Sequence, residues 1–351
     1  MPFTMKDNIQ EILDTLGIRE KLDYFYSLEL LNFVPKALWT SPLEAVEQQV
    51  TMPWGYPFNG EALLTAANAS EELFLTPEKY PFIPLWEELR EGCFPEYNRN
   101  DKSAVTLLSF EQEWTTRPQR AVIICPGGSY STLARGTEGF AAAKQMQAAG
   151  YRAFVLNYRF APNRWPEPQK DLALAVKFVR ANHDRYEIDP NQLMIMGFSA
   201  GGHLVASYTA FAEEVEQALM EDLRQSYSAL WQRYKGINPR PNALCLSYPV
   251  ISFCEECHEE SFQNLSGGDE SLREKLSIEK QADGRFPKTF LWACEDDDLV
   301  PASNAGRLSE TLTQAKVPNM LRIYPTGGHG CGTGEGTSAS GWMNEMLKYM
   351  A

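Results

Sequence analysis

The sequence contains a serine in a short turn between two glycines, a setting typical of a reactive hydroxyl group. Gly197-Phe198-Ser199-Ala200-Gly201 fits the pattern G-x-S-x-G and follows the apolar run 193–196. A serine on a sharp turn between strand and helix projects its hydroxyl above the sheet, and glycines on either side prevent collisions with the neighbouring backbone. The alternative is an ordinary glycine-rich turn. The position between strand and helix favours Ser199 as a nucleophile.

A second glycine-containing turn, Cys125-Pro126-Gly127-Gly128-Ser129-Tyr130, closes an apolar run upstream of this serine. A tetrahedral intermediate needs at least two N–H donors aimed at one oxygen, and glycines let the backbone approach closely. We therefore predict an oxyanion hole formed by the amides of Gly128, Ser129 and Ala200. Ala200 begins a helix whose N-terminus faces the same site. The alternative is a turn that only connects strand and helix.

The chain has only four histidines, so a general base can be sought by elimination. His183 lies at a helix end, His203 lies one turn into the helix after the serine and is expected to pack inward, and His258 lies in an insert between strands. His329 follows the last expected strand and has glycines on both sides, which form a compact loop able to bring an imidazole to the serine. His329 is the predicted base, and a solvated loop histidine is the alternative.

The acid that orients this base is expected on the turn after strand 289–294, because chains with this turn pattern place their residues in the order nucleophile, acid, histidine. A carboxylate there holds the histidine tautomer and stabilises the imidazolium. Asp296, Asp297 and Asp298 are consecutive on this turn, and their position alone does not distinguish them. An acidic run is also typical of a solvated turn.

From residue 104 onward, apolar runs alternate with amphipathic segments. The expected strands are 104–110, 121–125, 152–156, 193–196, 243–246, 289–294 and 320–324, and the expected helices are 141–149, 171–182, 302–315 and 342–349. Strands separated by helices of this length predict a doubly wound, mostly parallel sheet. Inserts at about 211–240 and 254–284 are predicted to be helical and cap-like, near the carboxyl ends of the strands.

Residues 1–100 differ from the rest and are predicted to be an N-terminal extension to a catalytic domain of residues 101–351. Residues 7–22 have helix-like apolar spacing, and the remainder is rich in aromatic residues and prolines. A disordered tail would be poor in aromatics, so we expect ordered but irregular structure. A lid, a docking arm and an element of a homodimer all fit this extension, and the sequence does not choose among them.

Composition limits the classes of partner. The formal net charge of the 351 residues is −14, which repels phosphate backbones and anionic lipids and argues against nucleic-acid or membrane binding. No apolar run approaches the length of a membrane span, and the first residues do not resemble a secretory signal. Seven cysteines, an odd number, favour reduced thiols. We therefore expect a cytoplasmic protein that acts on a small molecule.

One cysteine pair has the spacing of a haem or metal motif. Cys254-x-x-Cys257-His258 matches c-type haem attachment and half of a zinc site. A second cysteine pair at metal spacing does not occur, so free cysteines are the favoured interpretation. We expect neither a metal nor an organic cofactor.

Taken together, these motifs resemble the α/β-hydrolase carboxylesterases of the acetyl-xylan-esterase-like and hormone-sensitive-lipase-like group. The resemblance covers about residue 121 to the C-terminus. Besides the two glycine turns, it rests on Asn157-Tyr158-Arg159-Phe160-Ala161-Pro162, Pro168-Gln169-Lys170-Asp171-Leu172, Ile188-Asp189-Pro190, Gly202-His203-Leu204, Tyr248-Pro249-Val250, Asp297-Asp298-Leu299-Val300-Pro301 and Gly328-His329-Gly330.

The resemblance implies an α/β-hydrolase fold and selects Asp297, because the acid in this family belongs to an Asp-x-x-Val-Pro motif. The chain departs from the family at Ser129, where a third glycine is usual. Residues 1 to about 100 have no counterpart in the family.

The expected function is that of a serine hydrolase that cleaves carboxylic esters through an acyl-enzyme. The resemblance favours short acyl groups on sugars or small alcohols, and the sequence does not determine the acyl or alcohol specificity. Two alternatives are a serine peptidase acting on short peptides, which would use the same three residues, and a protein of this fold that binds a ligand without turnover. The complete set of nucleophile, base, acid and oxyanion loop argues against the second.

Overall fold

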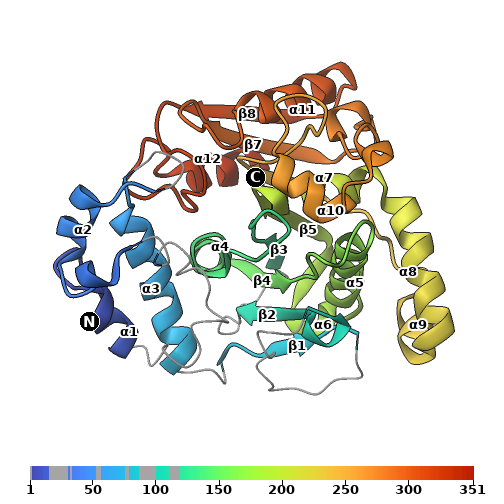
Figure 1. The fold of residues 1–351 in the computed structure, drawn as a ribbon. Helices are drawn as coiled ribbons and strands as arrows, with labels where there is room; N and C mark the ends of the chain where they lie inside the picture. Colours follow the sequence, from blue (N-terminus) through green and yellow to red (C-terminus); the bar gives the residue numbers. More distant parts are fainter. Residues whose placement is uncertain are drawn as a thin grey trace.

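The computed structural model describes residues 2–15, 31, 34–52, 57–75, 79–86, 100–110 and 119–351. Its centre is an eight-stranded sheet in the order β1-β2-β4-β3-β5-β6-β7-β8 (Figure 1). The strands are β1 (Phe82–Pro84), β2 (Thr106–Phe110), β3 (Gln119–Cys125), β4 (Tyr151–Asn157), β5 (Ile188–Phe198), β6 (Ala243–Ser247), β7 (Lys288–Cys294) and β8 (Asn319–Tyr324). The pairs β1–β2 and β2–β4 are antiparallel, and all other pairs are parallel.

The predicted mostly parallel sheet and α/β-hydrolase fold are confirmed. The helices are α1 (Ile9–Thr15), α2 (Leu43–Gln49), α3 (Gly60–Leu75), α4 (Ala141–Ala148), α5 (Glu167–Ala181), α6 (His183–Tyr186), α7 (Ala200–Ala210), α8 (Ala212–Ser226), α9 (Ser228–Tyr234), α10 (Glu259–Ser266), α11 (Ser303–Gln314) and α12 (Trp342–Met350). A π-helical turn, Arg135–Phe140, precedes α4. Among the described residues, no helix combines the length and apolarity needed to cross a membrane.

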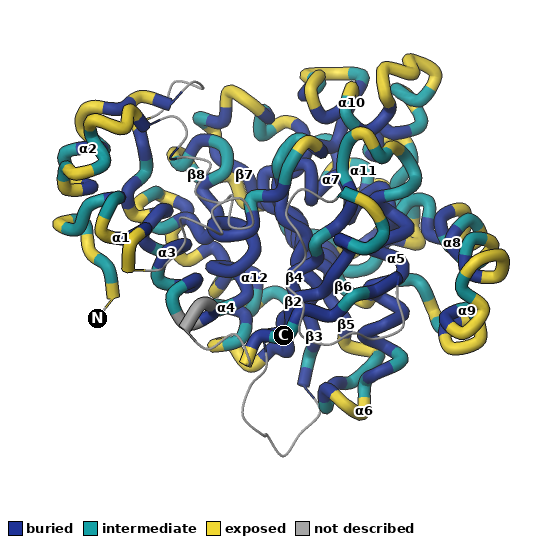
Figure 2. The backbone as a smooth tube through the Cα atoms, turned by 60° about the horizontal axis from the view of Figure 1, so that its bottom comes forward, coloured by how far each residue is buried: buried dark blue, intermediate teal, exposed yellow. Residues whose placement is uncertain are grey.

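The central strands are mostly apolar where they cross the core, because helices cover both faces of the sheet there. Residues 121–125 of β3 are buried without exception, as are residues 289–294 of β7. At the edge of the sheet, β8 is only partly covered, and Ile323 is 39% exposed. Figure 2 shows the buried strands at the centre and the exposed residues concentrated on outer helices such as α2, α8 and α9.

The main core extends N-terminal of residue 100. Ala69 and Leu73 of α3, together with Phe82 of β1, belong to the same buried cluster as the central strands. A second, smaller cluster contains Ile9 of α1 and Leu63 of α3. Helix α3 therefore contributes to both clusters and joins the start of the chain to the sheet.

Three elements of the N-terminal region were not predicted from the sequence, the helices α2 and α3 and the strand β1. The segment of α3, rich in Ala, Leu and Glu, carries the signal of a good helix former. The predicted helix 7–22 is present as α1, and residues 16–22 lie outside the described part of the chain.

The two predicted inserts have different surroundings. In the first insert, the buried residues Val215, Leu219 and Leu223 of α8 are spaced by four, which forms one apolar face, and this helix packs on α5. Lys177 of α5 forms an ion pair with Glu216 at 2.7 Å. The second insert contains α10, which contacts a loop of the candidate site described below.

Candidate active site

Ser199, His329 and Asp297 meet above the carboxyl ends of β5, β7 and β8. His329 Nε2 lies 2.7 Å from Ser199 Oγ, and His329 Nδ1 lies 2.7 Å from Asp297 Oδ2. The second carboxylate oxygen of Asp297 accepts the N–H groups of Leu299 at 3.1 Å and Val300 at 2.8 Å. With its Nδ1 proton directed at the carboxylate, His329 presents a lone pair to the serine hydroxyl, which is the arrangement of nucleophile, base and orienting acid.

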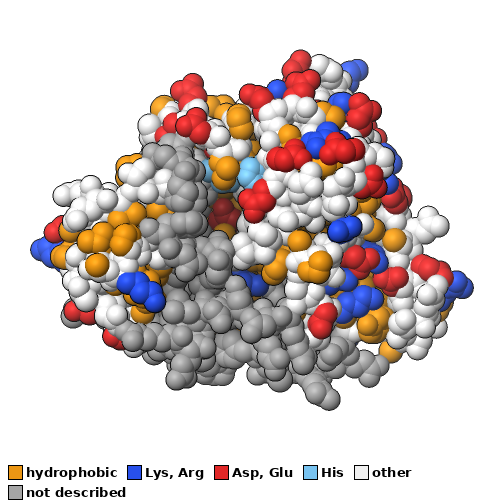
Figure 3. Space-filling model, in the orientation of Figure 1, with side chains coloured by type: hydrophobic (Ala, Val, Ile, Leu, Met, Phe, Trp, Pro, Cys, Tyr) orange, Lys and Arg blue, Asp and Glu red, His pale blue; other side chains and the backbone are white. Residues whose placement is uncertain are grey.

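One face of the molecule is hollowed, as the space-filling view shows. Histidine side chains are visible in a hollow near the middle of the face shown in Figure 3, with acidic side chains beside them. Ser199 itself is 6% exposed, so only a small part of its side chain is open to solvent.

The neighbouring aspartates have other surroundings. Asp296 accepts the N–H groups of Gly327 at 3.2 Å and Gly328 at 2.8 Å, so its carboxylate supports the backbone of the loop that carries His329. Asp298 is exposed. Of the three aspartates that position alone left open, Asp297 is the one whose carboxylate contacts the imidazole.

The turn at Ser199 is tight and strained. Its backbone angles are φ 50° and ψ −121°, a region that non-glycine residues rarely adopt and that costs on the order of 1–3 kcal/mol. The turn is held by two hydrogen bonds, from Ser199 N to Ser247 O at 3.0 Å and from Val250 N to Ser199 O at 3.1 Å. A Cβ on Gly201 would lie 2.1 Å from Cys125 O, so only glycine lets α7 begin this close to β3.

The three predicted oxyanion donors have backbone N–H groups that donate to no acceptor within the described residues. Ala200 is the first residue of α7, where helical N–H groups lack a partner inside the helix. Gly128 and Ser129 both have positive φ angles, 127° and 55°. A Cβ on Gly128 would also meet Thr132 O at 2.4 Å.

The loop 125–130, which carries two of the predicted oxyanion donors and is called the oxyanion loop, is held by the chain segment that follows β4 and by α7. Tyr158 donates its hydroxyl to Pro126 O at 2.6 Å, and Ala161 donates its N–H to Tyr130 O at 2.8 Å. The hydroxyl of Tyr130 lies 2.9 Å from Nδ1 of His203 in α7. The loop is therefore fixed at both ends of the predicted donor pair.

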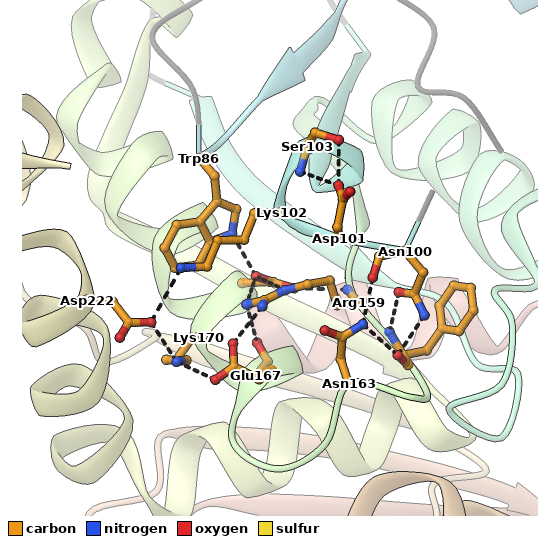
Figure 4. Close-up of polar contacts among 12 residues, drawn as sticks. Trp86, Asn100, Asp101, Lys102, Ser103, Arg159, Asn163, Glu167, Lys170 and Asp222 are labelled. Atoms are coloured by element: carbon orange, nitrogen blue, oxygen red, sulfur yellow. Dashed lines mark hydrogen bonds and ion pairs between the residues drawn. The ribbon is translucent and has the colours of Figure 1, made fainter. Parts of the chain in front are cut away.

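The segment after β4 is anchored in turn by a network of charged side chains (Figure 4). Arg159 contacts Asp171 at 2.8 Å and Glu167 at 2.6 Å. The indole N–H of Trp86 donates to the same buried Asp171 at 2.8 Å, and Lys102 lies 4.1 Å from the centre of the Trp86 ring. Trp86, which follows β1, and Lys102, which precedes β2, thereby contact the network that anchors this segment.

Sequence reasoning missed Glu138, a buried carboxyl on the π-helical turn. It accepts the N–H of Gly127 at 2.6 Å and the hydroxyl of Tyr248 at 2.9 Å, and that hydroxyl accepts the N–H of Gly332 at 2.9 Å. Glu138 thus links the oxyanion loop to the loop that carries His329. Burial raises the pKa of Glu138, and the hydrogen bond from Gly127 opposes this effect. One signal for this residue was available in the sequence, which is a carboxyl group between the oxyanion loop and the apolar start of the next helix.

The other two buried histidines are neutral neighbours of the site. His203 packs inward as predicted, with Nε2 2.8 Å from Leu276 O, and burial lowers its pKa from 6.5 to about 4. His258 lies 2.8 Å from the hydroxyl of Ser261, and burial, followed by the nearby charge of His329, lowers its pKa to about 4.

The motif Cys254-x-x-Cys257-His258 does not assemble a metal site in the structure. Cys257 Sγ contacts Glu259 and Arg273, at 3.5 and 3.4 Å. Within the described ranges, no group of three His, Cys, Asp or Glu side chains is placed to hold a metal ion.

Comparisons with known proteins agree with this fold. An endo-1,4-beta-xylanase B of Butyrivibrio fibrisolvens is 32% identical over 227 residues, which are 63% of this chain and 34% of that protein. An acetylxylan esterase of Xylanibacter ruminicola is 31% identical over 244 residues, which are 68% of this chain and 46% of that protein. The chain thus spans less than half the length of these two curated relatives.

A solved structure gives better mutual coverage. The acetyl ester-xyloside bifunctional hydrolase from Caldicellulosiruptor lactoaceticus superposes with a TM-score of 0.61 at 30% identity, over 76% of this chain and 92% of that chain. The family model described as BD-FAE matches residues 110–312, more than half of the chain. These matches bear out the predicted resemblance to acetyl-xylan-esterase-like α/β-hydrolases, and the chain belongs to the BD-FAE family.

Proposed function

We propose that the protein is a serine hydrolase that cleaves carboxylic esters through an acyl-enzyme, with Ser199 as nucleophile, His329 as base and Asp297 as acid. The observation that carries the proposal is the unbroken chain of two 2.7 Å contacts, from Ser199 Oγ to His329 Nε2 and from His329 Nδ1 to Asp297 Oδ2. Such a chain activates a hydroxyl that is a weak nucleophile by itself.

In the acylation step, His329 takes the hydroxyl proton as Ser199 attacks the ester carbonyl. The carbonyl oxygen becomes negative and receives hydrogen bonds from the amides of Gly128, Ser129 and Ala200. His329 then gives its proton to the leaving alcohol. In deacylation the same imidazole takes a proton from water, which attacks the acyl carbonyl and releases the acid and free Ser199.

Short acyl esters of sugars are the proposed substrate class. Support comes from relatives whose names are acetylxylan esterase and acetyl ester-xyloside hydrolase, both about 30% identical to this chain. The net charge of −14 also suits neutral esters better than anionic ones. We place the enzyme in the reducing cytoplasm because its cysteine count is odd. A homodimer formed through the N-terminal extension is also part of the proposal.

Replacement of the nucleophile tests the proposal directly. Ser199→Ala should fold normally and lose at least about 10³-fold in kcat toward p-nitrophenyl acetate, because the attacking oxygen is gone. A fluorophosphonate probe should label the wild-type protein and leave Ser199→Ala unlabelled.

Ser131→Ala is the matched control, because its exposed hydroxyl contacts Gly128 O and Glu260 instead of a histidine. This variant should still be labelled. A Ser199→Ala protein that retains wild-type turnover would refute the assignment.

A further inference from the structure

We propose that residues 47–52 and 57–62 of the N-terminal extension form the subsite for the alcohol half of the ester, and that this subsite selects neutral, hydroxyl-bearing alcohols over anionic ones. The inference rests on the proposed function and adds to it the part of the chain that recognises the leaving group.

A pocket of about 580 Å³ lies between this segment and the loop of the general base. One wall comes from the N-terminal region and the other from the loops after β7 and β8. The residues that matter are Glu47, Phe58 and Glu61 on the first wall, and Asp296, His329 and Thr337 on the second.

Contact with His329 indicates which half of the ester the pocket would hold. The base must deliver its proton to the oxygen of the leaving alcohol, so the alcohol lies on the histidine side of the nucleophile. The acyl carbonyl instead faces the oxyanion donors. Among the described lining residues are His329 and its neighbour Gly330, whereas Ser199, Gly128 and Ala200 are not among them. The pocket therefore fits the alcohol half.

Hydrogen bonds hold the N-terminal wall of the pocket in place. Asn59 caps the start of α3 by accepting the N–H of Ala62 at 2.9 Å, and Glu47 of α2 accepts the N–H of Gly60 at 3.2 Å. Across the pocket, a Cβ on Gly336 would lie 3.3 Å from Glu61 Cβ. Segments almost 300 residues apart in the chain therefore close on each other beside the base.

Charge determines the chemistry of the occupant. Glu47, Glu61 and Asp296 bring three carboxylates to the pocket, and none of them forms an ion pair with a lysine or arginine of the described residues. Carboxylates accept hydrogen bonds from hydroxyl groups, and their negative charge repels an anion. A neutral polyol fits this charge, and an alcohol carrying a carboxylate or phosphate does not.

The family match begins at residue 110, so this wall lies outside the part of the chain that defines the family. Alcohol selectivity is thereby assigned to the chain's own extension, while the chemistry of acyl transfer belongs to the shared domain.

Charge reversal at the pocket rim tests the proposal with the full-length protein. Acetylated glucose and acetylated glucuronic acid carry the same acyl group on a neutral and an anionic alcohol, and p-nitrophenyl acetate reports whether the protein hydrolyses esters at all. We expect the wild-type protein to prefer the glucose ester by about tenfold in kcat/KM. Glu61→Lys should reduce that preference by about tenfold, mainly through KM.

Glu44→Lys is the matched control, because Glu44 is exposed on α2 and is not part of the pocket lining. It should keep the wild-type preference. Glu61→Gln should give a smaller change than Glu61→Lys in the same direction, and added salt should weaken both effects because the side chain is exposed.

Three results would overturn the subsite: a wild-type preference for the anionic ester, an unchanged ratio in Glu61→Lys, or an equal change in Glu44→Lys. Failure of the proposed function would look different. In that case the wild-type protein would hydrolyse none of the three esters and would not react with the fluorophosphonate probe.

Discussion

At the scale of single residues, the candidate site depends on carboxyl groups whose work is set by their contacts. Asp297 contacts the imidazole, Asp296 supports the backbone beside it, and Glu138 holds the oxyanion loop from below. All three are acidic side chains within the same region, yet each has different donors. Their roles follow from geometry and could not be assigned from residue type.

Glu138 is expected to position the oxyanion loop and thus to affect the transition state more than substrate binding. Glu138→Gln retains the size of the side chain. One carboxylate oxygen of Glu138 accepts the N–H of Gly127 and the other accepts the hydroxyl of Tyr248. In the variant an NH2 group replaces one of these oxygens, so one of the two hydrogen bonds is lost. We expect kcat for p-nitrophenyl acetate to fall about tenfold with KM nearly unchanged, because oxyanion contacts form chiefly in the transition state.

The measurement is steady-state kinetics together with thermal unfolding. A rise in KM with unchanged kcat would contradict a positioning role for Glu138. Glu310→Gln on α11, an exposed carboxyl, is a control that should behave as the wild-type protein.

At the scale of elements, three parts of the fold form hydrogen bonds with the oxyanion loop. Helix α7 holds Tyr130 through His203, the segment after β4 holds the carbonyl of Tyr130, and α10 holds the carbonyl of Ser129 through Asn264 Nδ2 at 2.9 Å. Of the two predicted cap-like inserts, the one containing α10 therefore contacts the site directly. The insert containing α8 packs on α5.

Removal of the α10 contact should loosen the loop without unfolding the helix. Asn264→Ala deletes one hydrogen bond worth about 0.5–1.5 kcal/mol, so kcat/KM for p-nitrophenyl acetate should fall about two- to twelvefold. Gln263→Ala changes the adjacent exposed side chain, whose amide donates to Glu259 of the same helix at 2.7 Å, and should have little effect. Equal losses in the two variants would mean that α10 acts through its stability alone.

At the scale of the whole molecule, we expect the buried His203 to make stability depend on pH. Burial lowers the pKa of His203 to about 4, whereas an unfolded histidine titrates near 6.5. The unfolded chain therefore binds a proton first as the pH falls. The stability contributed by neutral His203 is complete above pH 6.5 and is lost progressively as the pH falls from 6.5 toward 4.

We expect the free energy of unfolding to fall between pH 7 and pH 5, with about 2 kcal/mol of that loss due to His203. Urea unfolding of His203→Gln should show a shallower pH dependence by that amount. His183→Gln is the matched control, because the side chain of His183 is 41% exposed, and it should retain the wild-type slope. Parallel slopes for all three proteins would refute this origin of acid sensitivity.

The molecule is also larger than the part that defines its family. Helix α3 shares residues between the N-terminal cluster and the main core, and β1 belongs to the central sheet. The main core contains residues on both sides of position 100, and the domain boundary there stays a prediction. The role of the extension stays a prediction, and its pocket beside His329 suggests where that role is exercised.

Most of the fold beyond residue 100 could be predicted from the sequence, and so could the choice of Ser199 and His329. Strands covered on both faces are mostly apolar, and the turn at the nucleophile requires glycines at fixed spacing. Both features can therefore be recognised from a short stretch of sequence. The selection of Asp297 depended on the family resemblance, because three consecutive aspartates have nearly the same local context.

Only the tertiary structure decided which distant side chains meet. Glu138 and Tyr248 are 110 residues apart, and Glu61 and Gly336 are further apart still, so no local pattern relates the members of either pair. Periodicity in a sequence reports which face of an element is buried. It does not report which loop lies opposite that face, because the position of a distant loop depends on the path of the whole chain. The link between the oxyanion loop and the loop of His329, and the N-terminal wall of the pocket, are both set by that path.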